Sequence, residues 1–176
     1  MKRFFVVVVC VVSCLAGRAS TDGYRITGKV PGVKKAMVYL VTNSNNVTDT
    51  IARAEIINER FELNGNVSEV IPTLLVLSNQ SMGGVPLYLE NEAYQVEINP
   101  YFIYYSAIKG GGEAQRISDE YRSIEMKNRK ETDKYREELE KLKPEDARYQ
   151  ELLNLFRTVD DRIGAEQKVF CEKYAD

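Results

Sequence analysis

The sequence predicts an α+β fold, in which an antiparallel β-sandwich is followed by a C-terminal α-helical hairpin. Between residues 23 and 109, apolar and polar side chains alternate in about eight short stretches separated by turn signals, a pattern typical of half-buried strands. From Glu113 the composition changes to charged residues and strong helix formers, with apolar residues three or four positions apart. We therefore expect a sandwich over residues 21–112 and a helical hairpin over residues 113–176.

Residues 1–20 have the features of a secretory signal. Lys2 and Arg3 precede a run of about ten apolar residues, whereas a membrane-spanning helix needs about 20. Small residues follow the run, as they do around a signal cleavage site. We therefore expect the protein to be exported to the cell envelope.

The stretch Val11-Val12-Ser13-Cys14 resembles the bacterial lipobox, in which a small residue precedes the cysteine that is lipidated. The resemblance implies that Cys14 becomes the first residue of the mature protein and carries acyl chains. Two or more acyl chains anchor a protein stably in a membrane. The protein would then face the periplasm or the cell surface as a lipoprotein. The alternative is simple cleavage after Ala16 or Ala19 and release in soluble form.

The composition excludes several kinds of chemistry. The chain has no histidine, which excludes Ser-His-Asp and Cys-His catalysis and every imidazole metal site. Its three cysteines, Cys10, Cys14 and Cys171, include no C-x-x-C pair for dithiol redox chemistry. The formal net charge of −2 argues against a broad surface for nucleic acid. We expect a protein that is not an enzyme, has no cofactor or metal, and does not bind nucleic acid.

The first strands are expected at residues 24–30 and 37–41, with Pro31 and Gly32 as turn residues between them. In the second of these strands both faces are apolar. A polar loop at 43–46 then leads to a pair of strands joined by a tight turn.

Residues 49–65 are expected to form a β-hairpin with Asn58 and Glu59 as a two-residue loop, because pattern and register then agree on one apolar face. Glu59 is a poor residue for the positive φ of a type I′ turn, so a longer loop stays an alternative. The predicted cross-strand pairs are Ile57 with Arg60, Ile56 with Phe61 and Ala54 with Leu63.

The remaining strands follow at short intervals. The continuous apolar run at 74–77 is typical of a strand covered on both faces. Residues 85–89 and 94–98 are expected to pair as a second hairpin, and 107–109 to form a last short strand. The triple glycine at 110–112 lacks the G-x-x-x-x-G-K-[ST] pattern of a phosphate loop, which favours a flexible joint before the helices.

The helical part carries an apolar stripe that a highly charged stretch interrupts near its middle. Pro144 breaks the stripe, and the simplest arrangement is two antiparallel helices of about 30 residues that turn near this proline. The polar middle is expected to bury poorly, so that the hairpin projects at least in part. Its apolar stripe should pack on the sandwich, on another copy or on a further domain.

Four stretches of the β-rich part occur in the order YRITGKVPG, MVYLV, DTIARAEIINERFELNG and GVPLYLENEAYQVEI, with IKGGG after the last. Together they resemble the Bacteroidetes domain of unknown function found at the N-terminus of many TlpA/ResA-like thiol-disulfide oxidoreductases of the AhpC/TSA type, over roughly residues 22–115. The resemblance implies an immunoglobulin-like sandwich, usually exported and often a lipoprotein. In the larger members a helical segment and a thioredoxin-like domain with a C-x-x-C pair follow. This chain stops at Asp176 without that domain, so redox activity is unsupported.

The most aromatic stretch of the chain is YFIYY at 101–105. One interpretation is a hydrophobic patch for a partner. The other, which we favour because aromatic side chains mostly fill cores, is packing between the sandwich and the helices. The candidate partner contacts are Tyr101, Phe102, Tyr104 and Tyr105.

Two further residues have alternative interpretations. Cys171 lies beside Phe170 on the helical stripe, which favours a small buried hydrophobe over a redox thiol or an intermolecular disulfide. Asp49-Thr50-Ile51 resembles the tripeptide at which Bacteroidetes O-glycosylate exported proteins, so Thr50 is a candidate glycosylation site; the alternative is a simple strand entry. The acidic pairs Glu90/Glu92 and Asp160/Asp161 are interpreted as charges on solvated faces.

These observations predict a non-catalytic, envelope-anchored accessory domain that acts through protein contacts. Its partner would be a thioredoxin-like protein or a second copy of itself, and it would reach the membrane through the lipid anchor. One alternative is the severed N-terminal portion of a thiol-disulfide oxidoreductase, since the apolar stripe still runs at Tyr174. A weaker alternative is a lipoprotein that binds a glycan or a small ligand at a sandwich edge.

Overall fold

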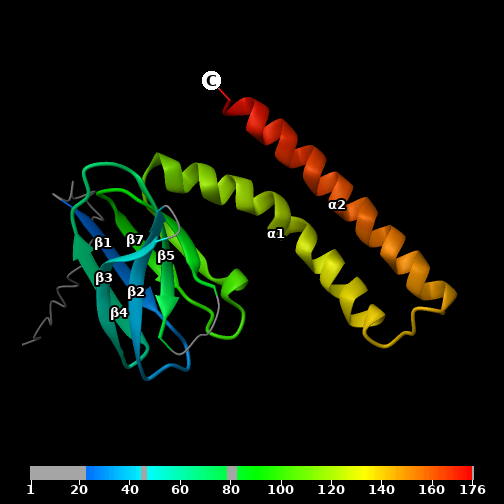
Figure 1. Ribbon diagram of the computed structural model, residues 1–176, viewed down its shortest axis with the longest axis horizontal. Coiled ribbons are helices and arrows are strands. Elements are labelled where there is room, and N and C mark those ends of the chain that lie inside the picture. The colour runs from blue at the N-terminus through cyan, green and yellow to red at the C-terminus, as the bar shows by residue number, and fades with distance from the viewer. Residues whose placement is uncertain (1–22, 45–46, 79–82, 176) are drawn as a thin grey trace, which may run out of the picture.

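A computed structural model describes residues 23–44, 47–78 and 83–175, and it confirms an α+β fold with two C-terminal helices (Figure 1). Eight strands come first, and the described residues between Tyr24 and Lys109 include no α-helix, only the short 3₁₀ turn η1 (Ile103–Tyr105). The strands are β1 (Tyr24–Lys29), β2 (Lys35–Ser44), β3 (Val47–Ile57), β4 (Arg60–Gly65), β5 (Ile71–Leu77), β6 (Val85–Leu89), β7 (Ala93–Glu97) and β8 (Ala107–Gly110).

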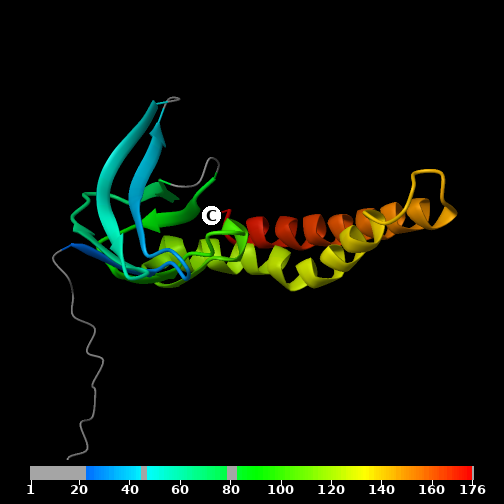
Figure 2. The same ribbon diagram turned by 90° about the horizontal axis from the view of Figure 1, so that it is seen from below.

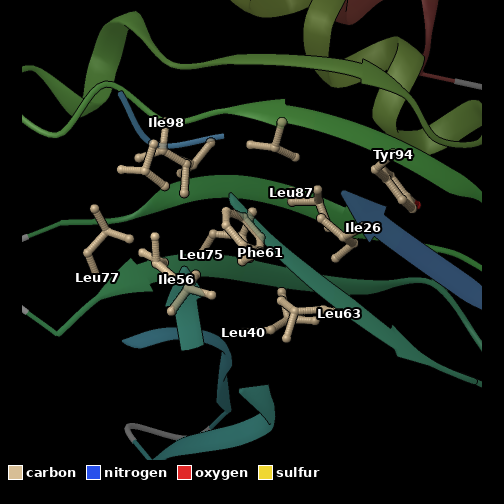
Figure 3. Close-up of a cluster of buried hydrophobic side chains, with 14 of the residues drawn as sticks. Ile26, Leu40, Ile56, Phe61, Leu63, Leu75, Leu77, Leu87, Tyr94 and Ile98 are labelled. Carbon is tan, nitrogen blue, oxygen red and sulfur yellow. The ribbon is translucent and has the colours of Figure 1, made fainter. Parts of the chain in front are cut away.

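The eight strands form one curled, mixed sheet in the order β6-β5-β2-β3-β4-β1-β7-β8. β1 and β7 are parallel and the other neighbours are antiparallel, so the structure does not confirm the fully antiparallel, immunoglobulin-like sandwich. The sheet bends between β3 and β4, which share only the pair Ile57–Arg60. Apolar side chains from both sides of this bend meet in one core (Figure 3). The alternation of apolar and polar residues along the strands predicts such a common core, but it does not specify which strands are neighbours.

The tight turn between β3 and β4 is confirmed as a two-residue loop. Asn58 and Glu59 have φ values of 50° and 67°, the left-handed conformation that a type I′ turn needs. The Glu59 carboxylate accepts a hydrogen bond from the backbone N of Gly32 at 2.8 Å, which supports the unfavourable conformation of this residue. Of the predicted pairs, Ile57 with Arg60 is confirmed. Ile56–Phe61 and Ala54–Leu63 are not ladder pairs, because β3 pairs along its length with β2, and β4 with β1.

The predicted second hairpin is wrong, because β6 pairs with β5 and β7 pairs with β1 and β8. At residues 90–92 the chain crosses from β6, at one end of the sheet order, to β7, which lies next to the strand at the other end. Side-chain hydrogen bonds link β6 to β7 in place of a ladder. The hydroxyl of Tyr94 accepts from the backbone N of Glu90 at 2.8 Å and donates to the carbonyl of Tyr88 at 2.9 Å.

The two helices, α1 (Glu113–Leu139) and α2 (Ala147–Lys173), run antiparallel and extend away from the sheet (Figure 2). Ion pairs link the two helices near both ends of their contact, Glu120 with Lys173 at 2.9 Å and Glu138 with Arg148 at 2.7 Å. Each helix has 27 residues and is therefore about 40 Å long at 1.5 Å per residue. The predicted projection is confirmed: α1 contacts β6 near its start, and α2 packs along α1.

The polar middle of α1 is better buried than expected. Asn128 and Thr132 are 7% and 8% exposed. Asn128 donates to the Ile124 carbonyl at 2.8 Å and Thr132 to the Arg129 carbonyl at 2.9 Å, so both polar groups are satisfied within their own helix.

The start of α1 is joined to the sheet by Gln115, a side chain that is 1% exposed. Its Oε1 accepts from the backbone N of Tyr88 on the outer edge of β6 at 2.9 Å. Its Nε2 donates to Asp119 at 2.9 Å, so the buried amide is held at both ends. The helix thus satisfies a backbone donor that an open sheet edge would leave unpaired.

Candidate interaction surface

The aromatic segment, residues 101–105, connects β7 to β8 and presents large rings to solvent. Tyr101, Phe102 and Tyr105 are 81%, 65% and 43% exposed. The rings of Phe102 and Tyr105 meet edge to face with centroids 6.3 Å apart. Three large side chains in one short segment therefore form a contiguous exposed surface.

The backbone of the aromatic segment is fixed by two polar side chains. Asn99 Oδ1 accepts from the backbone N of Tyr101 at 3.0 Å and of Phe102 at 2.9 Å. The hydroxyl of Ser106, which is buried, accepts from the backbone N of Asn99 at 3.0 Å. These local bonds, together with the turn η1, hold the backbone of the segment in one arrangement.

Tyr104 attaches the aromatic segment to α1. The guanidinium of Arg129 lies 3.9 Å from the centre of the Tyr104 ring, a distance typical of a cation–π contact. Arg122 donates to the carbonyls of Tyr104 and Ser106. Burial, and after it the nearby carboxylate of Glu125, raises the pKa of Tyr104 to about 12.

Tyr105 makes a second connection to the helix, because its hydroxyl donates to the Asp133 carboxylate. Asp133 also pairs with Arg136 at 3.1 Å, and Arg129 pairs with Glu125 at 3.4 Å. Of the exposed rings, Tyr105 therefore contacts a group of charged residues on α1.

A second apolar surface lies between the helices. A groove of about 530 Å³ opens between α1 and α2 near the C-terminal end of α2. Val169, at its rim, is 66% exposed. The other lining residues are Glu120, Ser123, Ile124, Ala165, Glu166, Phe170 and Lys173.

The candidate partner contacts fall into two groups. Tyr101, Phe102 and Tyr105 lie on the surface, whereas Tyr104 packs against α1 as the packing interpretation expects. Sequence reasoning missed Arg129 and Asp133, because the charged middle of α1 has the pattern of a solvated helix face.

The other candidate residues lie elsewhere. Thr50 is exposed in the ribbon formed by β2 and β3, and its glycosylation stays a prediction. Cys14 lies outside the described residues. Cys171 is exposed and free, so its predicted burial is wrong; its neighbour Phe170 contacts Tyr121 of α1, whereas Cys171 lies at the surface. Asp160 and Asp161 are exposed as expected, while one carboxylate oxygen of Glu90 is buried without a hydrogen bond.

In the described part of the chain, no three cysteine, aspartate or glutamate side chains gather into a group that could hold a metal ion. Among the same residues, no helix combines the length and apolar character needed to cross a membrane.

Comparison with known proteins places this arrangement in context. The family described as a domain of unknown function (DUF4369) matches residues 24–116, more than half of the chain. The matched range contains all eight strands, the aromatic segment and the start of α1. No curated protein and no solved structure matches the sequence.

Proposed function

The chain belongs to the DUF4369 family, and we propose that it is a non-catalytic interaction domain of the cell envelope that binds a protein partner through the aromatic segment. The observation that carries this proposal is the exposure of Tyr101, Phe102 and Tyr105 on a firmly supported turn. Tyrosine and phenylalanine are enriched at protein interfaces, where a few residues carry most of the binding energy.

The rigid support of these rings favours binding. A loop that must become ordered on association loses conformational entropy, which weakens the complex. Here the Asn99 side chain and the contact between Tyr104 and Arg129 hold the segment before any partner arrives. The rings can therefore bury their area in a partner at a small ordering cost.

The same proposal includes the cellular location of the protein and the identity of its partner. We expect the protein to be exported and held at a membrane through acyl chains on Cys14, with a thioredoxin-like protein or a second copy of the chain as its partner. The likeness of residues 22–115 to domains that precede TlpA/ResA-like oxidoreductases supports this choice. Fractionation of cells that express C14S tests the anchor, since this variant should leave the membrane fraction.

A photo-crosslinking amino acid placed at Phe102 in the full chain tests the contact. We expect one dominant crosslinked protein at this position and none from the same group placed at Lys168, an exposed site on α2. Equal crosslinking at both positions would contradict a specific contact. The absence of catalysis is tested separately by insulin reduction, because turnover that persists in C171A would reveal redox chemistry.

The groove between α1 and α2 favours a second candidate, in which the helices dock a thioredoxin-like domain as part of an oxidoreductase. Val169 is exposed at the rim of this groove, and Phe170 and the largely buried Ile124 line it, so the described residues leave an apolar surface open there. V169E would then weaken association with such a domain in a pull-down, while F102S would not. A C-x-x-C domain encoded beside this gene would supply the natural probe.

A further inference from the structure

A trough runs along the outer face of β1, β7 and β8, on the side of these strands that faces away from the core. A cavity of about 540 Å³ forms its centre, and a neighbouring cavity of about 450 Å³ shares Thr27, Gln95 and Lys109 with it. At the other end a pocket of about 180 Å³ shares Glu97 and Ala107 with the central cavity and is lined by Tyr101 and Tyr105. The trough therefore leads directly to the aromatic segment.

Two cations face each other in the trough. Lys29 of β1 lies directly opposite Arg60 of β4, and Lys109 reaches the same cavity from β8. Within the described residues none of these three side chains has an ion-pair partner within 4 Å. Glu97, opposite Lys29 on β7, is the acidic side chain that lines the central cavity, which leaves an excess of two positive charges.

The juxtaposition of Lys29 and Arg60 is unfavourable in the free protein, and Glu97, opposite Lys29 on the other side, offsets it only in part. Like charges directly opposite each other on neighbouring strands repel, whereas opposite charges stabilise the pair. The next cation along β1 shows the usual solution, because Arg25 is paired with Glu62 at 3.0 Å. The chain as a whole has a formal net charge of −2, so this local excess of positive charge is not a general property of its surface.

We propose that the partner of the aromatic segment lays an extended, acidic peptide segment in this trough, with carboxylates at Lys29, Arg60 and Lys109 and an apolar residue against Phe102. This inference rests on the proposed function. Arg25 to Lys29 spans about 13 Å at 3.3 Å per residue, room for about four residues of an extended peptide. Thr27, whose hydroxyl donates to the Tyr94 carbonyl at 3.2 Å, can accept from the peptide backbone, and Gln95 can both donate and accept. Phe102, whose ring meets that of Tyr105 at this end of the trough, offers a contact for an apolar side chain, which favours a protein over an acidic glycan.

Two fluorescein-labelled synthetic peptides test the proposal by fluorescence anisotropy on the folded chain. One is five repeats of Glu-Ser, and the other is the same peptide with Leu-Leu added at one end. We expect both to bind, with at least fivefold weaker affinity for K29S/R60S than for the unsubstituted protein. K141S/K143S removes the same charge at the far end of the helices, and its affinity should be unchanged. Higher salt should weaken peptide binding more for the unsubstituted protein than for K29S/R60S, which lacks two of the charges.

The outcomes separate the trough from the aromatic contact. Suppose that the peptide with leucines binds at least threefold more tightly than the peptide without them, and that F102S abolishes this difference. Together with weaker binding to K29S/R60S, this result supports both the trough and the aromatic contact. If the leucines add nothing but K29S/R60S still binds weakly, the aromatic contact fails and the acidic site stands. Equal affinity of K29S/R60S and the unsubstituted protein overturns the trough, whatever the leucines do. Tighter binding of labelled oligogalacturonate than of either peptide, with the same dependence on Lys29 and Arg60, would overturn the peptide in favour of an acidic glycan.

Discussion

Gly28 of β1 lies directly opposite Phe61 of β4, and the Phe61 ring occupies the space that a side chain at Gly28 would need. A Cβ atom added to Gly28 would come within 2.0 Å of that ring. Phe61 is 6% exposed and belongs to the core, so it has little room to move. The glycine is therefore required by close packing, and the ring covers the backbone that the missing side chain leaves bare.

We expect G28A to destabilise the protein by about 1–3 kcal/mol, the usual cost of overpacking a well-filled core. Equilibrium unfolding in urea, followed by circular dichroism, measures the change. G164A is the matched control, since no atom lies within 4 Å of its added Cβ on α2. That substitution should stabilise the protein by about 0.5–1 kcal/mol, because alanine is a better helix former. Equal stability of the two variants would contradict the packing argument.

The turn at Asn58 and Glu59 gives a second test. Glu59 is held at φ 67° although it has a side chain, and its carboxylate accepts a hydrogen bond from Gly32. E59A loses the hydrogen bond and keeps the strain, whereas E59G loses the hydrogen bond but relieves the strain. We expect E59A to be less stable than E59G by about 1 kcal/mol in the same urea experiment. The reverse order would show that the left-handed conformation of Glu59 is not strained.

The strands were predictable from the sequence, whereas their neighbours were not. Alternation reports which side chains face a core, and together with the continuous apolar run at 74–77 and the turn signals it predicts strands at the places of all eight. It is silent on pairing, and so the two strands on either side of residues 90–92 were wrongly joined as a hairpin. The hydroxyl of Tyr94 makes the contact that replaces the hairpin. In the sequence, Tyr94 only continues the apolar positions of a strand, so this polar contact could not be predicted.

The site was predictable in the same partial way. The aromatic segment can be recognised in the sequence as a cluster of aromatic residues. The residues that hold it against α1, Arg129 and Asp133, follow more than 20 residues later in a charged helix. The trough draws Lys29, Arg60 and Lys109 from three different strands. Such a cluster is defined by the strand order alone, which alternation does not determine.

The contact between Tyr104 and Arg129 should couple the aromatic segment to α1. We expect Y104A, R129A and the double variant to give a coupling free energy of about 0.5–2 kcal/mol, the range for a partly desolvated cation–π pair. The measurement is a double-mutant cycle of unfolding free energies. A cycle between Y104A and K130A, a neighbouring exposed cation on α1, is the control and should give additive changes. Additivity in the first cycle as well would mean that the ring and the guanidinium do not interact.

Tyr94 should control the stability of the protein in alkaline solution. Its side chain is 1% exposed, and burial raises its pKa to about 12. In the unfolded chain a tyrosine titrates near pH 10. Between these two values the unfolded state has lost the proton that the folded state keeps, so the free energy of unfolding decreases as the pH rises. Below pH 10 the stabilising contribution is fully present.

Replacing Tyr94 with phenylalanine should therefore have two effects. At neutral pH, Y94F leaves the Glu90 N–H and the Tyr88 carbonyl without their partner, which should cost about 1–3 kcal/mol. Between pH 10 and 12, the stability of Y94F should fall less steeply than that of the unsubstituted protein. The decline should persist in part, because the pKa of Tyr104 is also raised to about 12. Y101F, which alters an exposed ring, should follow the unsubstituted curve, and an equally steep fall in Y94F would show that the buried hydroxyl does not control it.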